Sequence, residues 1–296
     1  MFKNDWAHYS YDGIKNSYRI SNRSLFDFSC SIKNTSISHK SVLNDLATEI
    51  YEKNNRLDIL LSGGLNSQII VKTYKELGIP VNVKIFSYEN DINLHWDVAA
   101  ALKFCQDQKI KYTKIDFNLK KFFELEAEHY FKKSLNTDVS KLPLLKMIEY
   151  CDNMPVLGTA YPLITRSNFF YDTPATWDLR ILESEINILG YSQKINRPVI
   201  SNWFLYDSNF LSSLINHSAM QDLIKDKNTG CTSNFEIRSK IYDLKINRVS
   251  QSGLEWESNN WLFPDFVNDF YHKVISSSIQ SKMKVVKIKN FTDQVS

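Results

Sequence analysis

The chain has 296 residues, of which 43% are hydrophobic, so it can form a packed core and is not disordered as a whole. Its 36 basic and 33 acidic residues leave a net charge of +3, which does not by itself indicate a nucleic-acid or membrane surface. The four cysteines lie far apart, which argues against a zinc site. No apolar run approaches the roughly 20 residues of a membrane span, so the chain is predicted to be a cytoplasmic protein and not a membrane protein.

The first 40 residues are predicted to be an N-terminal extension. They are polar and aromatic without clear periodicity, and short strand-like runs occur at 17–20 and 24–28. From Ser41 onward, apolar residues recur at helical spacing up to Tyr51. We expect a helix there, with Ser41 as its N-cap.

Strands and helices alternate between residues 57 and 158. The strands are expected at 57–61, 81–87, 112–117 and 154–158. The helices are expected at 69–77, 93–108 and 119–132, with another ending near Cys151. This alternation predicts right-handed crossovers and a parallel sheet with helices on both faces. Residues 41–165 are therefore predicted to form one α/β domain.

Strand-like patterns become weak in the sequence beyond Gly158. Residues 166–296 are therefore predicted to be a mainly helical region packed on the α/β domain. Its helices are expected at 179–189, 210–224, 235–244 and 266–279. Residues 282–289 alternate lysines with apolar residues and are interpreted as either a late strand or a solvated tail.

A glycine-rich loop, Ser62-Gly63-Gly64-Leu65-Asn66-Ser67, follows the first strong strand. Paired glycines let the backbone curl so that successive amides point at one anion, and the next helix adds its positive N-terminal dipole. Ser62 and Ser67 can donate hydrogen bonds to the same phosphate. The alternative is a tight turn followed by a serine N-cap. The loop lacks both the Lys-Ser/Thr ending of a P-loop and the spaced glycines of a dinucleotide fingerprint.

The loop resembles the SGGxDS signature of the PP-loop ATP pyrophosphatases, which adenylate a substrate and release pyrophosphate. Within that superfamily the chain looks most like the synthetase domain of asparagine synthetases and like the compact asparagine-synthase-like proteins of tailed phages. The similarity covers about residues 41 to 260. Besides the loop, it is carried by Asp97-Val98-Ala99-Ala100, Val156-Leu157-Gly158, Ile237-Arg238-Ser239-Lys240 and Arg248-Val249-Ser250-Gln251-Ser252-Gly253-Leu254.

The resemblance implies roles for individual residues. ATP would be the nucleotide, with Ser87 and Tyr88 facing its adenosine and Gly158 allowing close backbone approach. Lys240 and Arg248 would stabilise the charge that develops on an adenylate, although a solvated helix face explains both equally well. Asn66 would act at the reacting phosphates. The pyrophosphate portion would be held by Leu61, Ser62, Gly63, Gly64, Leu65, Asn66 and Ser67.

The sequence also departs from the family pattern at three points. Asn66 stands where the family has an acidic residue, residues 159–162 replace an acidic pair, and the catalytic lysine expected near Ser250 is absent. Asparagine keeps an acceptor oxygen but loses the charge that binds a hard cation. Mg²⁺ would therefore depend on recruitment by the phosphates of ATP.

These observations lead to three functional hypotheses. The first is an ATP-dependent ligase that activates a small-molecule carboxylate for attack by an amine. It would lack its own glutaminase, because Phe2 stands where that domain would expose a nucleophilic cysteine. The second is a catalytically inactive nucleotide-binding or structural protein on the same fold. The third is an enzyme that modifies a nucleobase, for which the basic residues 282–289 are the only support.

Overall fold

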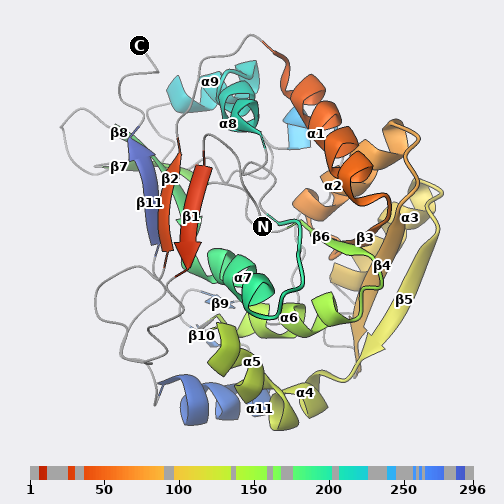
Figure 1. Cartoon of the computed structure of the whole chain (residues 1–296), viewed down its shortest axis with the longest axis vertical. Coiled ribbons are helices and arrows are strands. Elements are labelled where there is room, and N and C mark those ends of the chain that lie inside the picture. The colour runs from red at the N-terminus through yellow and green to blue at the C-terminus, as the bar shows by residue number, and fades with distance from the viewer. Residues whose placement is uncertain are drawn as a thin grey trace.

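The described part of the computed structural model contains one parallel sheet and three smaller antiparallel sheets, with helices around them (Figure 1). The structure describes residues 7–11, 26–30, 37–89, 97–134, 138–158, 163–167, 176–201, 207–225, 239–244, 256–257, 260–261, 264–276 and 285–290.

The parallel sheet has four strands in the order β5-β4-β3-β6. Ile59 in the central strand β3 lies opposite Val83 of β4 on one side and Val156 of β6 on the other. All four residues of β3 are buried, so helices and loops cover both faces of the sheet there. The predicted α/β fold class is confirmed. The strands are β3 (Leu57–Leu60), β4 (Asn82–Tyr88), β5 (Tyr112–Phe117) and β6 (Met154–Leu157).

The helices associated with this sheet end close to the predicted positions, but α2 begins four residues before the predicted start, and residues 93–96 of a predicted helix lie outside the described residues. Two further corrections concern α1 and the predicted helix at 119–132. Ser38, not Ser41, is the N-cap of α1, because the backbone of Ser38 is extended and its side chain accepts a hydrogen bond from the Ser41 amide. The predicted helix at 119–132 is two helices, since Glu126 leaves the helical conformation with φ −124°. The helices are α1 (His39–Asn54), α2 (Leu65–Glu76), α3 (Ala99–Asp107), α4 (Leu119–Leu125), α5 (Ala127–Ser134) and α6 (Leu142–Glu149).

Beyond Leu157 the described part of the chain is mostly helical, as predicted, but it contains more strands than the single late strand that was predicted as one alternative. Its helices are α7 (Glu183–Lys194), α8 (Ser208–Ile215), α9 (Ser218–Lys225) and α11 (Asp265–Phe270), the last continued by a π-helical segment, Tyr271–Ser276. Three strands, β7 (Leu163–Ser167), β8 (Thr176–Leu182) and β11 (Val285–Asn290), form an antiparallel sheet in the order β11-β8-β7. Residues 179–182, predicted to be helical, therefore belong to β8.

The remaining strands settle two predictions about the chain ends. β11 shows that the basic stretch near the C-terminus is a strand from residue 285 to 290 and not a tail. β2 (Phe26–Cys30) lies near one predicted strand-like run and pairs with β1 (Ala7–Tyr11), which was not predicted. Two short strands, β9 (Trp256–Glu257) and β10 (Asn260–Trp261), also pair. The predicted run at 17–20 lies outside the described residues, as does 235–238 of a predicted helix.

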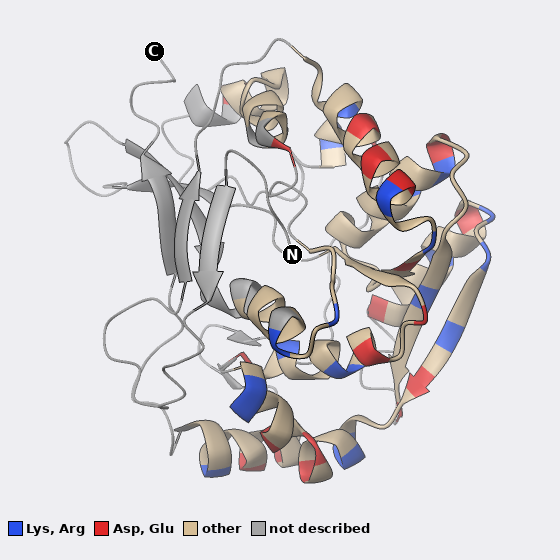
Figure 2. Cartoon of the chain, viewed as in Figure 1, with Lys and Arg blue, Asp and Glu red and all other residues tan. Residues whose placement is uncertain are grey.

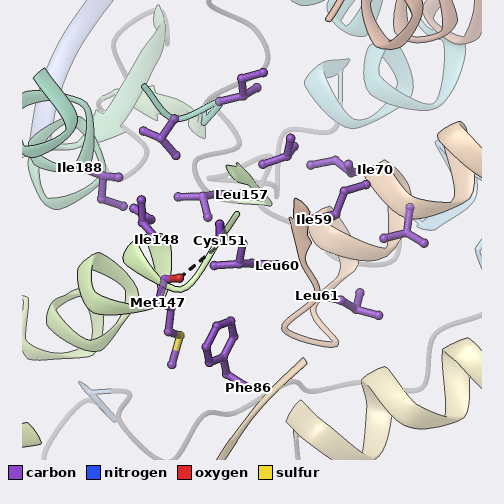
Figure 3. Close-up of a cluster of buried hydrophobic side chains, with 14 of the residues drawn as sticks. Ile59, Leu60, Leu61, Ile70, Phe86, Met147, Ile148, Cys151, Leu157 and Ile188 are labelled. Carbon is purple, nitrogen blue, oxygen red and sulfur yellow. Dashed lines mark hydrogen bonds between the residues drawn. The ribbon is translucent and has the colours of Figure 1, made fainter. Parts of the chain in front are cut away.

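The hydrophobic core continues from the parallel sheet into the C-terminal helices. Figure 3 shows Ile148 of α6 and Ile188 of α7 near Leu157 of β6, with Leu60 of β3 on the same side of the cluster. Cys151 lies in this core and its thiol contacts the Met147 carbonyl at 3.7 Å. Burial raises the pKa of the Cys151 thiol to about 12, so this cysteine is not a nucleophile at neutral pH. Within the described residues, no helix is long and apolar enough to span a bilayer.

A buried carboxylate ties the amino ends of the strands together. Asp58, on β3, is fully buried and lies 3.0 Å from Nζ of Lys84 on β4. Its oxygens also accept hydrogen bonds from the side chains of Asn82 and Asn153 at 3.0 and 2.8 Å, and from the backbone amide of Asp152 at 2.9 Å. Asp58 therefore joins β3, β4 and the turn before β6 at the edge opposite the glycine loop.

Candidate nucleotide site

The glycine loop lies at the carboxyl end of β3 and leads directly into α2. Leu61 extends the strand pairing, because its amide donates to the Lys84 carbonyl at 2.9 Å. Gly63 has φ +83°, a conformation that other residues rarely adopt. A Cβ at Gly63 would stand 2.2 Å from the Asp97 carbonyl and 2.9 Å from the Ala101 amide. The loop therefore turns tightly against the start of α3, and Gly63 is required by both conformation and space.

The N-terminus of α2 has the composition of an anion site. Its N-cap is Gly64, which has no side chain to cap the first-turn amides. The hydroxyls of Ser62 and Ser67 lie 3.2 Å apart, and the Gly64 amide donates to Ser62 Oγ at 3.3 Å. Ser67 Oγ in turn donates to the Gly64 carbonyl at 2.9 Å. Two hydroxyls are thus gathered at a helix N-terminus, where the dipole favours a phosphate.

Gly158 joins this site from β6. A Cβ on Gly158 would lie 2.5 Å from the Ser67 amide nitrogen and 2.6 Å from its Cα, so the end of β6 packs directly on the first turn of α2. β4 and β6 flank β3 on opposite sides, which makes this edge of the sheet the crossover position where α/β proteins bind ligands. Close approach of Gly158 to a nucleotide stays a prediction.

Ser87 and Tyr88 end β4 at the same edge. Both are buried, and the Tyr88 ring packs 6.0 Å from the Phe117 ring of β5. The parallel pairing of β3 and β4 places these residues beside the loop in the sheet order. Their contact with adenosine is not tested by this arrangement. Asn66, the second residue of α2, is half-buried within the loop itself.

The predicted cationic residues are less closely connected to the loop. Lys240 is exposed in the segment 239–244, whose Tyr242 carbonyl accepts a hydrogen bond from Lys72 Nζ at 3.0 Å. Lys72 lies seven residues along α2 from Leu65, or about 10 Å at 1.5 Å per residue. The segment also lines a pocket of about 130 Å³ with His39, Leu43, Ile69 and Glu76. Arg248, residues 159–162 and Ser250 lie outside the described residues.

The described residues around the loop do not fit a protein-built magnesium site. Among the parts of the chain that the structure describes, no group of three or more His, Cys, Asp or Glu residues could hold a metal ion. Asn66 contributes no charge at the position where the resemblance expects an acid. We therefore derive no chemical step through a metal.

Gln68, in the first turn of α2, contacts the loop and was not among the predicted site residues. It is buried, and its Nε2 donates to the Gly63 carbonyl at 2.6 Å, closing the loop from inside α2. The motif itself gave no signal for this contact, because the pattern ends at Ser67. Gln68 acts as a positioning residue for the loop backbone.

Replacing Gln68 by methionine is expected to weaken ATP binding by roughly ten-fold. The change keeps the length of the side chain but leaves the buried Gly63 carbonyl without its donor, which costs about 1–3 kcal/mol. Isothermal titration calorimetry with ATP would measure the effect. Lys75→Ala, at the exposed far end of α2, is the control and should leave affinity unchanged. Equal affinities for Gln68→Met and the wild type would contradict the positioning role.

Searches with known proteins give distant structural likenesses and no family. No family model and no curated protein matches the chain. Among solved structures, it is similar to the NMN synthetase of Francisella tularensis, at 11% identity and TM-score 0.31 over 83% of this chain and 97% of that one. It is also similar to the NH3-dependent NAD synthetase of Campylobacter jejuni, at 9% identity and TM-score 0.31, covering 83% and 96%.

A third solved structure extends this set. The U34-tRNA thiolase NcsA of Methanococcus maripaludis, which carries a [4Fe-4S] cluster, is 15% identical with a TM-score of 0.30, over 83% of this chain and 80% of that one. TM-scores near 0.3 are too low to carry an argument about this chain. Its function is therefore inferred from the residues of the loop and the sheet.

Proposed function

We propose that the chain is an ATP-dependent adenylating ligase of the asparagine-synthetase type, which activates a carboxylate and passes it to an amine. The observation that supports this most is the uncapped N-terminus of α2, with two serine hydroxyls 3.2 Å apart beside the curled Gly63-Gly64 backbone. This arrangement suits the phosphates of a nucleotide. Its place at the sheet crossover leaves β4 and β6 on either side of the bound molecule.

The proposed chemistry has two steps. An oxygen of the substrate carboxylate attacks the α-phosphorus of ATP, the bond to the bridging oxygen breaks, and pyrophosphate leaves. The amine nitrogen then attacks the activated carbonyl, loses a proton, and AMP leaves. Negative charge grows on the departing pyrophosphate, so the α2 amides and the hydroxyls of Ser62 and Ser67 would stabilise it most in the transition state. Asn66 would donate its side-chain amide to the same phosphates, and Lys240 and Arg248 would offset charge on the adenylate.

Asn66→Ala is expected to lower the rate of pyrophosphate release at least ten-fold while the affinity for ATP changes little. Removing one preorganised polar group at a reacting phosphate costs about 2.7–4 kcal/mol in the transition state. The measurement is pyrophosphate release with ATP, a panel of small carboxylates and an amine. Lys75→Ala serves as the control on the same helix. Failure of the wild type to bind ATP by calorimetry would rule out the proposal.

A catalytically inactive nucleotide-binding protein is the second candidate. The observation in its favour is that Asn66 is uncharged and the described residues around it hold no metal-binding group. Such a protein would bind ATP through backbone amides and serines without turning it over. If the wild type binds ATP but releases no pyrophosphate with any carboxylate or nucleic acid, and Asn66→Asp does not create the activity, this candidate replaces the ligase.

A further inference from the structure

The outer edge of the parallel sheet is an exposed strand. In the described part of the chain, β5 pairs with β4 alone, and Figure 1 shows it at the margin of the molecule. Five of its six residues are exposed or half-buried, and Tyr112 is 45% exposed. The unpaired N–H and C=O groups of such an edge are a template for another strand.

The charges on this edge do not repel a second copy. Edge lysines commonly prevent strands from pairing, but Lys114 Nζ lies 3.0 Å from Asp116 on the same strand, with side chains 41% and 68% exposed. Figure 2 shows both signs of charge along β5. The exposed face of the strand is therefore close to neutral, and two such strands can approach each other.

The order of residues in β5 is complementary to itself in one antiparallel register. With Ile115 on a two-fold axis opposite Ile115 of a second copy, Lys114 faces Asp116 of that copy, and Asp116 faces its Lys114. Directly opposed charges of opposite sign stabilise antiparallel strands. On the other face, Thr113 then lies opposite Phe117, beside the two isoleucines. A register centred on Lys114 would instead oppose the two lysines.

We propose that β5 is a homodimer interface, in which two copies of the chain pair β5 antiparallel about Ile115 and form a continuous eight-stranded sheet. A second copy is the occupant that the edge fits, because the alternation Lys114, Ile115, Asp116 complements its own reversed sequence. A two-fold axis through a single strand pair also closes the assembly, so no open fibre results. This proposal does not depend on ATP binding, because β5 lies at the sheet edge beyond β4 and away from the glycine loop.

A charge-swap series tests both the interface and its register. In sedimentation equilibrium the wild type is expected to be a dimer. Lys114→Asp and Asp116→Lys each place like charges opposite one another twice per dimer and should weaken association at least ten-fold. The double variant Lys114→Asp/Asp116→Lys restores both opposite-charge pairs and should restore the dimer. Lys103→Asp, which breaks an exposed ion pair with Asp107 on α3, is the control and should remain dimeric.

Chemical cross-linking provides a readout that does not depend on the charged variants. Ile115→Cys places two cysteines across the axis, so a short thiol cross-linker should join the copies. The wild type treated in the same way controls for the four native cysteines, and Lys121→Cys, exposed on α4, controls for random collision. A monomeric wild type, a double variant that stays as weak as the single ones, or cross-linking no better than in Lys121→Cys would each overturn the proposal.

Discussion

We expect Gly63→Ala to lower the free energy of unfolding by about 3 kcal/mol and to abolish ATP binding. The added Cβ meets backbone atoms at 2.2 and 2.9 Å, belonging to Asp97 and Ala101 at the start of α3. Neither can rotate away as a flexible side chain could. The positive φ of Gly63 adds a conformational penalty of about 1–2 kcal/mol. The loop must therefore open or α3 must move, and either change disperses the amides that would face a phosphate.

Gly78→Ala provides the matched control for this effect. Gly78 also has positive φ, +68°, but an added Cβ there would meet nothing within 4 Å. Gly78→Ala should lower the free energy of unfolding only by the conformational penalty, about 1–2 kcal/mol, and leave the affinity for ATP unchanged. Gly158→Ala isolates the steric part, because Gly158 does not have positive φ and its added Cβ would lie 2.5–2.8 Å from N, Cα and Cβ of Ser67. Urea unfolding measures the free energy of unfolding of each variant, and calorimetry measures its affinity for ATP. A Gly63→Ala variant no less stable than Gly78→Ala would show that the loop can relax.

Local sequence patterns predicted the parallel sheet well. The apolar run at 57–61, interrupted only by Asp58, lies between Arg56 and Ser62, and Met154–Leu157 lies between Asn153 and Gly158, so the ends of both strands are marked in the sequence. β8 was missed because residues 179–182, which are apolar except for Arg180, run directly into α7 without a break. Its partner β11 was left open between a strand and a tail, because the pairing that makes it a strand joins residues about 100 positions apart, as in Ile181 with Val286. Such pairing overrides local propensity.

In the candidate site, too, local features were predictable from the sequence and contacts between distant residues were not. The position of the glycine loop between a strand and a helix was predictable, because adjacent glycines at the end of an apolar run mark a tight turn; its binding of phosphate stays a prediction. The contacts that fix the loop were not predictable, since they join distant residues: Asp97 with Gly63, and Gly158 with Ser67. Asp58 was visible in the sequence as an interruption of an apolar strand, but its role depends on residues more than 90 positions away.

Asp58→Asn is expected to lower the free energy of unfolding by about 3 kcal/mol near neutral pH. The substitution preserves shape but leaves the Lys84 ammonium, which is largely buried, without its buried partner. It also sets an amide NH₂ against backbone amides that now donate to the carboxylate. Asp107→Asn, in an exposed pair with Lys103, is the control and should change stability by at most about 0.5 kcal/mol.

The pH dependence of this effect tests its electrostatic origin. Burial alone would raise the pKa of Asp58, but hydrogen bonds from Asn153, Asn82 and Lys84 lower it from 3.8 to about 2. The folded protein therefore holds this proton less tightly than the unfolded chain. The resulting stabilisation, about 2 kcal/mol, is present above pH 4 and is lost as the pH falls from 4 to 2.

The difference in stability between wild type and Asp58→Asn should accordingly shrink by about 2 kcal/mol between pH 5 and pH 2. Taking the difference removes acid effects that both proteins share, including that of His39, whose pKa burial lowers to about 3. Urea unfolding at several pH values measures it. If the difference in stability stays constant over this range, the Asp58→Asn substitution destabilises the protein through packing. The charge of Asp58 then does not help to hold β3, β4 and the turn before β6 together.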